Sequence, residues 1–320
     1  MKRRFFLPAA VLIGLAAAAA LAAVLMRADL SAEGNEGGRR IGAVYMTMNN
    51  PFYTIVDNRL LLKVDSMGDV LLTRDPELDQ ERQNQQIQDL LEEGIDLLVV
   101  TPVEREGVLP ALEQVRRAGI PIIVVDTPTP DYNYADCTIW SDNYDAGAQC
   151  AKDLMRRRDE ATILLLEHDV AKSARDRIQG FLDTIDGNDR YKVMARIECW
   201  GQLEIAMPET AAFLDQHGPV DAIMALNDPS ALGALEALES RGQLGGTLVY
   251  GVDGTPEAKA LIQDGLMTAT AAQSVYRLGD LVGEAAYRIL NGEPVEREVV
   301  IPVELITAEN LTDYNVDGWQ

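Results

Sequence analysis

The sequence contains few of the residues that form catalytic and metal sites. Its 320 residues include two histidines, His168 and His217, and three cysteines, Cys137, Cys150 and Cys199. The cysteines are not spaced as a CxxC pair, and no G-x-S-x-G, P-loop or H-E-x-x-H motif is present. We therefore expect no cofactor and no bound metal. An odd number of cysteines leaves at least one thiol free, and isolated cysteines are typical of buried positions.

Basic residues are also scarce. There are 28 Lys and Arg against 51 Asp and Glu, which gives a formal net charge of −23. A nucleic-acid-binding protein needs a basic face, so this balance argues against that class of partner. The excess of carboxylates predicts a well-solvated surface. The chain is long enough to bury one large core or two medium ones.

The first 40 residues differ in composition from the rest. MKRRFF supplies three basic residues, the run from Phe5 to Met26 has no charge, and SAEGNEGGRR follows as a polar linker. This pattern predicts a secretory signal sequence or an uncleaved membrane anchor. We expect the body of the chain, from Ile41 onward, to lie in the periplasm or at the outer face of the cytoplasmic membrane. Membrane contact would then come only through the N-terminal segment.

From Ile41 onward, short β-branched runs alternate with amphipathic, helix-like stretches. Strand-like runs include IGAVYM, LLVVT, IIVVD, AIMALN and VVIPVEL. In the stretch ERQNQQIQDLLEEG, one face carries Ile87, Leu90 and Leu91, and Gly94 marks the end. Such alternation predicts βαβ units and parallel sheets covered on both faces. The strands are too many for one open sheet, so we expect an α/β fold of two doubly wound parallel-sheet domains.

Polar or aromatic residues follow most of the predicted strands. Ligands of doubly wound sheets bind beyond the carboxyl ends of the strands, which makes these residues candidates for one site. Carboxylates, amides and a guanidinium bind hydroxyls, and aromatic rings cover the apolar faces of a sugar. The set predicts a site for a small neutral polyol. The candidates are Asn50, Phe52, Tyr53, Asp126, Arg175, Trp200, Asn227, Asp253 and Gln273. His168 and Ser173 also follow a strand but are not among them.

Each candidate also has a purely structural interpretation. Asn50 and Asn227 could cap helices, and Asp253 in VDGTP could form a turn. Arg175 could pair with a surface acid, and Trp200 could belong to the core. The recurrence of such residues after successive strands favours a site.

The motifs NNPFY, AGIPIIVVD, SARDRIQGF, NDPSALGAL, VYGVDGTPEA and TATAAQ occur in this order. With them the chain resembles the periplasmic sugar-binding proteins of ABC transporters, the ribose-binding-protein-like group of type I solute-binding proteins. The resemblance covers about residues 41–306. It implies two lobes joined by a three-segment hinge, with crossings near residues 141–143, 273–275 and 301–303. The N-terminal lobe would comprise residues 41–142 and 274–302, and the C-terminal lobe residues 143–273 and 303–320.

The resemblance also implies a function. The nine candidates map onto ligand-contacting positions, and the protein would deliver a monosaccharide (a ribose-like pentose, a hexose or a related polyol) to ABC transporter permease subunits. We expect a monomer without enzymatic activity. Two departures leave the sugar open: Thr127 stands where ribose binders carry an arginine, and Val252 where they carry an aromatic residue.

Other functions remain as alternatives. A sugar or autoinducer receptor feeding a sensor kinase or chemoreceptor would have the same binding fold. A sugar-responsive transcription repressor needs a helix-turn-helix head before the first strand, where this chain has an apolar segment. An enzyme could use Asp126 and Asp253 as an acid pair, and turnover of a bound sugar would reveal it.

Overall fold

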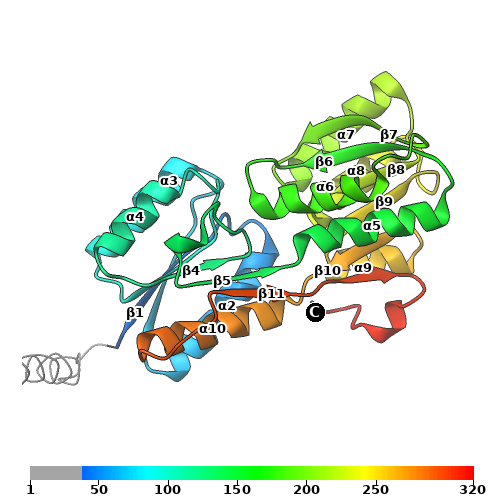
Figure 1. Cartoon of the computed structure of the whole chain (residues 1–320). Helices are drawn as coiled ribbons and strands as arrows, with labels where there is room; N and C mark the ends of the chain where they lie inside the picture. The colour runs from blue at the N-terminus through cyan, green and yellow to red at the C-terminus, as the bar shows by residue number, and fades with distance from the viewer. Residues whose placement is uncertain (1–37) are drawn as a thin grey trace, which may run out of the picture. The chain divides into compact units, whose positions relative to one another are not determined.

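The computed structural model describes residues 38–320, so the predicted leader lies outside the described residues. These residues form two six-stranded sheets (Figure 1). The first, in the order β11-β5-β4-β3-β1-β2, consists of β1 (Arg40–Val44), β2 (Val70–Arg74), β3 (Leu97–Val100), β4 (Ile122–Val125), β5 (Cys137–Ser141) and β11 (Glu298–Ile301). The second, in the order β12-β10-β9-β8-β6-β7, consists of β6 (Ala161–Glu167), β7 (Tyr191–Glu198), β8 (Ala222–Ala225), β9 (Leu248–Asp253), β10 (Ala269–Ala272) and β12 (Glu304–Thr307).

Helices cover both faces of each sheet. The first sheet is covered by α2 (Pro51–Ser66), α3 (Gln80–Glu92), α4 (Leu109–Arg117) and α10 (Val275–Leu290). The second is covered by α5 (Asn143–Arg157), α6 (Lys172–Ile185), α7 (Leu203–His217), α8 (Asp228–Glu239) and α9 (Pro256–Gln263). We call each sheet with its helices a lobe, first and second. The predicted α/β fold of two doubly wound sheets is confirmed.

Strand β3 shows why these strands read as continuous apolar runs. Leu97 and Val99 pack into the cluster that includes α2 and α10, whereas Leu98 and Val100 pack into the cluster that includes α3 and α4. All four side chains are fully buried because helices lie on both faces of the sheet. Within residues 38–320, no helix is long and apolar enough to cross a membrane.

The chain passes between the sheets three times: from β5 to α5, from β10 to α10 and from β11 to β12. The third passage corrects one strand prediction. The run VVIPVEL is not one strand, since β11 pairs in parallel with β5 and β12 pairs antiparallel with β10. Pro302 lies between them and has no N–H to donate to a ladder, so the strand ends there.

Two glycines bring α5 and α6 into close contact. A Cβ atom on Gly147 would lie 1.7 Å from the carbonyl oxygen of Arg177, and one on Gly180 would lie 1.9 Å from that of Tyr144. Only glycine fits at these positions, so the backbones of the two helices touch. This contact sets the position of α6 and of the arginine that it carries.

The three cysteines, Cys137, Cys150 and Cys199, are buried, and none of them forms a disulfide. Cys199 lies 3.3 Å from the hydroxyl of Ser230. Burial raises the pKa of each thiol, so these cysteines are protonated, packed side chains.

Candidate ligand-binding site

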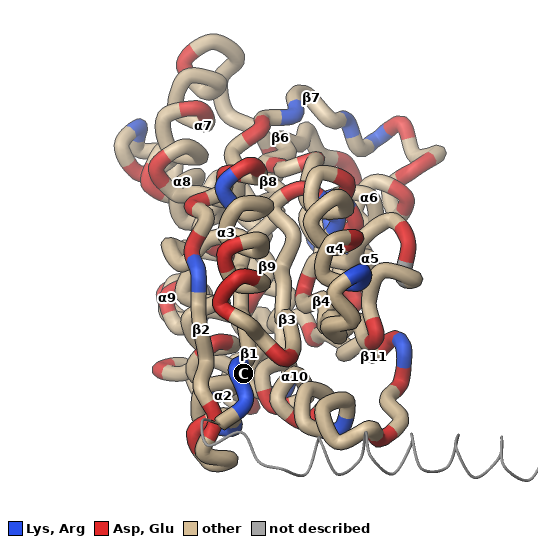
Figure 2. Tube along the Cα trace, turned by 90° about the vertical axis from the view of Figure 1, so that its left-hand side faces the viewer, with Lys and Arg blue, Asp and Glu red and all other residues tan. Residues whose placement is uncertain are grey.

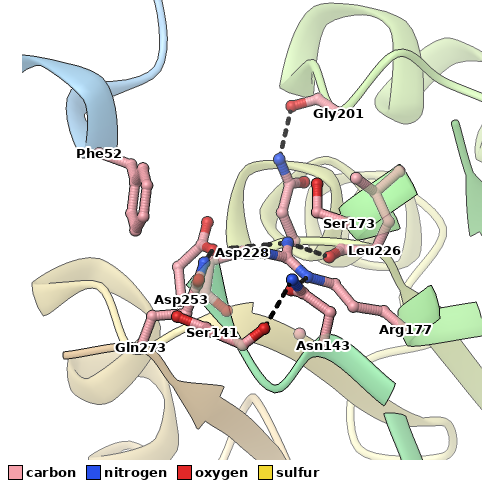
Figure 3. Close-up of polar contacts among 12 residues, drawn as sticks. Phe52, Ser141, Asn143, Ser173, Arg177, Gly201, Leu226, Asp228, Asp253 and Gln273 are labelled. Carbon is pink, nitrogen blue, oxygen red and sulfur yellow. Dashed lines mark hydrogen bonds and ion pairs between the residues drawn. The ribbon is translucent and has the colours of Figure 1, made fainter. Parts of the chain in front are cut away.

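A cavity lies between the lobes, at the carboxyl ends of strands from both sheets. Its empty volume, including the part open to solvent, is about 460 Å³. Eight of the nine candidate residues line it: Asn50, Phe52, Tyr53, Asp126, Trp200, Asn227, Asp253 and Gln273. The close-up in Figure 3 shows Phe52 facing Asp253 and Gln273 across a gap.

Two carboxylates are buried in this cavity. Asp126 follows β4 and is 3% exposed, and Asp253 ends β9 and is 2% exposed. Asp126 Oδ2 accepts hydrogen bonds from the Tyr53 hydroxyl at 3.0 Å and from the Thr127 hydroxyl at 3.2 Å. Asp253 Oδ1 accepts one from Gln273 Nε2 at 2.7 Å. Burial raises the pKa of Asp126, and it raises the pKa of Asp253 to about 8.

Three acceptor oxygens in the cavity have no partner. They are Asp126 Oδ1, Asp253 Oδ2 and Gln273 Oε1. Each belongs to a side chain that is at least 97% buried. A buried polar atom without a partner costs about 1–3 kcal/mol, so these oxygens favour a ligand that donates hydrogen bonds.

The guanidinium of the site comes from Arg177 and not from Arg175, which corrects the sequence prediction. Arg175 points out of the cavity, where its half-exposed side chain pairs with Asp169 at 3.2 Å. Arg177 is 4% exposed and lines the cavity, with Nη1 3.6 Å from Asp253 Oδ1. The two arginines lie two positions apart on α6, which is about 200° of rotation around the helix.

Arg177 is held by two elements of the second lobe, the start of α5 and the residue that follows β8. Its Nε donates to Asn143 Oδ1 at 2.7 Å, and its Nη1 donates to the carbonyl oxygen of Leu226 at 2.8 Å. Asn143 in turn donates to the carbonyl of Ser141 at 2.9 Å. Figure 3 shows this chain of contacts running from Asp253 to the passage between β5 and α5.

The two asparagines are helix caps as well as lining residues. Asn50 Oδ1 accepts from the backbone N–H of Phe52 at 3.0 Å and begins α2. Asn227 Oδ1 accepts from the N–H of Ser230 at 3.0 Å and begins α8. Asn227 Nδ2 also donates to the carbonyl of Gly201 at 3.0 Å. The structural interpretation of both residues is therefore correct, and it coexists with their place in the cavity wall.

Aromatic rings line the cavity from both lobes. Phe52 and Tyr53 are both buried and lie edge to face, with ring centroids 5.4 Å apart. Trp319, from the C-terminal tail, lies 6.2 Å from Phe52. On the second lobe, Trp200 is 46% exposed and stacks on His168 at 5.7 Å. Trp200 is therefore not a core residue.

Four lining residues, Asp126, Trp200, Asp253 and Leu78, have a backbone conformation that is unusual for a side chain with a Cβ. The φ angles are 65° at Asp126, 59° at Trp200 and 132° at Asp253. Glu77 and Leu78 are the other such residues outside glycine in the described part of the chain, and Leu78 also lines the cavity. Strained residues of this kind concentrate at functional sites, because only a functional constraint keeps them.

Several lining residues are absent from the nine candidates. His168 is 4% exposed, with Nδ1 2.8 Å from Glu198 Oε1, and its Nε2 has no partner. The Ser173 hydroxyl lies 2.7 Å from that of Thr127, which joins the two lobes. Both His168 and Ser173 follow β6, so position after a strand was a usable signal for them. Trp319 does not line this cavity but packs beside Phe52, and it lies in a tail that had no recognisable motif.

Two α/β lobes with a buried polar cavity between them are the architecture of the solute-binding proteins. A family model described as a periplasmic binding protein domain matches residues 41–294, and the chain belongs to this family. The ribose import binding protein of Haemophilus influenzae is 31% identical over 310 residues, which cover 96% of this chain and 100% of the relative.

Solved structures show the same fold. An ABC transporter solute binding protein from Mycobacterium smegmatis with bound glycerol has a TM-score of 0.81 and 29% identity, with 87% of this chain and 96% of that one covered. One from Bacillus halodurans C-125 with bound myo-inositol has a TM-score of 0.81 and 25% identity, with 88% and 98% covered.

Proposed function

We propose that this protein captures a monosaccharide or related polyol between its two lobes and delivers it to the permease subunits of an ABC transporter. The observation that carries the proposal is the set of three buried oxygens without donors, on Asp126, Asp253 and Gln273. Sugar hydroxyls donate hydrogen bonds and would satisfy all three. Bonds to an ionised carboxylate are roughly twice as strong as neutral ones.

The aromatic residues complement this polar wall. Phe52 and Trp200 come from different lobes and line the same cavity. Their rings can cover the apolar C–H faces of a sugar while its hydroxyls reach the acceptors. The bound glycerol and myo-inositol of the similar structures and the name of the ribose-binding relative support a polyol.

The same contacts explain why a ligand would close the lobes. Without ligand, closure buries the carboxylates of Asp126 and Asp253 with one oxygen each unpaired, which disfavours the closed form. Ligand hydroxyls remove that cost and shift the equilibrium towards closure. The chain Asp253–Arg177–Asn143–Ser141 connects the site to the first passage between the lobes.

We place the boundaries of the moving lobes at the three passages, after residues 142, 273 and 302. Membership of the family implies a periplasmic location, and we propose that residues 1–40 export the protein or anchor it at the outer face of the cytoplasmic membrane. The binding role needs no catalysis, and we propose that the protein acts as a monomer.

Calorimetric titration of the purified full chain with a panel of monosaccharides and polyols tests the binding function. Asp253→Ala removes two acceptor oxygens from the cavity and should lower affinity at least a hundredfold. Arg175→Ala is the matched control, because it removes a charge on the same lobe outside the cavity. Equal binding by wild type and Asp253→Ala would show that this cavity is not the site.

A further inference from the structure

The charges buried in the cavity do not balance. Asp126 and Asp253 carry two carboxylates, and Arg177 is the one Arg or Lys among the described residues that line the cavity. Arg177 is shared further, because it donates to Asn143 and Leu226 and approaches Asp253 only to 3.6 Å. With both carboxyls ionised, the cavity would hold one negative charge that the protein does not compensate, and the ligand-free protein avoids this charge by keeping a proton on the buried Asp253. A cationic ligand could take the place of that proton.

Neighbouring buried charges do not supply the missing cation. Asp228 and Lys259 are both fully buried; burial lowers the pKa of Lys259, and the attraction to Asp228 acts against that lowering. Lys259 Nζ donates to backbone carbonyls of the C-terminal tail, on Asn315 and Gly318, and not to the cavity. The charges of Asp228 and Lys259 therefore offset each other. The balance of charge in the cavity still depends on Asp126, Asp253 and Arg177.

His168 does not supply the missing positive charge either. Its Nδ1 lies 2.8 Å from the carboxylate of Glu198, which is itself 44% exposed. A protonated His168 would be balanced by Glu198, and a neutral one adds no charge. The pair as a whole contributes no positive charge to the cavity.

The unpaired atoms that face the cavity include the three acceptor oxygens described above, on Asp126, Asp253 and Gln273. An ammonium group supplies one positive charge and three donors, which is enough for the unpaired oxygens of both Asp126 and Asp253. Asp and Glu also occur along the elements of both lobes (Figure 2), and the net charge of −23 attracts cations towards the protein.

We propose that the preferred ligand is a cationic amino derivative of a polyol, an amino sugar or amino cyclitol, whose ammonium group binds between Asp126 and Asp253. This inference rests on the proposed function and narrows it, since the sequence alone predicted a neutral polyol. The hydroxyls of the ligand still meet Gln273 and the remaining carboxylate oxygens. The ammonium adds a charge-assisted bond that a neutral sugar cannot form.

Calorimetric titration of the full chain at pH 6.5 with matched ligands tests this. The set comprises D-glucose, D-glucosamine and N-acetyl-D-glucosamine, together with myo-inositol and a monoamino inositol. We expect each amine to bind at least tenfold more tightly than its neutral parent, and N-acetylation to abolish the gain. A neutral parent that binds as tightly as its amine would overturn the inference and leave the binding function intact. Binding of neither kind would refute both.

The variant Asp126→Asn tests whether the carboxylate of Asp126 causes the preference for amines. Asparagine tolerates the φ of 65° at this position and keeps an acceptor for Tyr53, so the fold should survive. We expect the variant to weaken binding of neutral polyols as well, and to weaken binding of amines at least tenfold more, so that the preference for amines is lost. Asp65→Asn, at an exposed position on α2, is the control for a change of one charge and should keep the preference. If Asp126→Asn does not fold, Asp253→Asn makes the same test. A preference that survives in the cavity variant overturns the assignment to this carboxylate pair.

Discussion

Replacing Asp253 with asparagine tests whether the cavity contains a carboxylate that the protein alone cannot stabilise. The side chain is 2% exposed, its Oδ2 has no partner, and Arg177 is 3.6 Å from the other oxygen. Burial raises the pKa of Asp253 from 3.8 to about 8, against the lowering effect of Arg177, and Asp228 and Asp126 add to the rise.

The sign of the pH effect follows from proton binding. Between about pH 4 and pH 8 the folded protein keeps the proton on Asp253, whereas the unfolded chain releases it. The folded state then binds more protons, so the free energy of unfolding falls as pH rises through this window. Each pKa unit corresponds to about 1.4 kcal/mol, so we expect a loss of a few kcal/mol in the ligand-free protein.

Urea denaturation of the ligand-free wild type and of Asp253→Asn between pH 5 and pH 8, at constant ionic strength, measures this effect. The other acids titrate alike in both proteins, so the difference between them isolates Asp253. We expect Asp253→Asn to gain stability relative to wild type as pH rises, although it loses affinity for ligand. A difference that does not change with pH would refute the assignment of an uncompensated buried carboxyl.

Three further substitutions test the site and its support. Arg177→Ala should destabilise the fold by about 3–5 kcal/mol in urea denaturation, because it leaves Asn143 Oδ1 and the Leu226 carbonyl without their donor and removes the cation near the buried Asp126. Exposed Arg175→Ala should change stability by less than about 0.5 kcal/mol; similar effects of the two would contradict their placement. Phe52→Ala should lower the free energy of sugar binding, measured by titration, far more than the free energy of unfolding, measured by denaturation. An equal loss of both would assign Phe52 to the core. Gly147→Ala should destabilise the fold by about 3 kcal/mol or more and weaken binding, because its Cβ would meet the Arg177 carbonyl at 1.7 Å. Gly246→Ala is the control and should do neither, because its Cβ would meet only the Gln243 carbonyl oxygen, at an ordinary contact distance of 3.7 Å.

Much of the fold could be predicted from local pattern. Runs such as LLVV in β3 are apolar on both faces because helices cover both faces of the sheet. A continuous apolar run is therefore a clear sign of such a strand in the sequence. The split between β11 and β12 depends on which sheet each half joins, which is a tertiary choice. Pro302 was the local sign of it, and its lack of an N–H explains why one run became two strands.

The site was predictable where residues directly follow strands, as for Asp126 and Asp253. It was not predictable within a helix, where the facing residue depends on how the helix is rotated. Contacts between α5 and α6 determine the rotation that turns Arg177 inward and Arg175 outward, and those contacts join residues about 30 positions apart in sequence. Trp319 reaches Phe52 only through the path of the C-terminal tail, so no local pattern could identify it.

The most direct test of the account is mass spectrometry of the small molecules released when the purified protein is denatured. The wild type should release a polyhydroxylated compound of monosaccharide size that carries one amine. The Asp253→Ala variant should release none. A released compound without hydroxyl groups, or the same compound in equal amount from both proteins, would contradict the claim that this cavity binds a polyol.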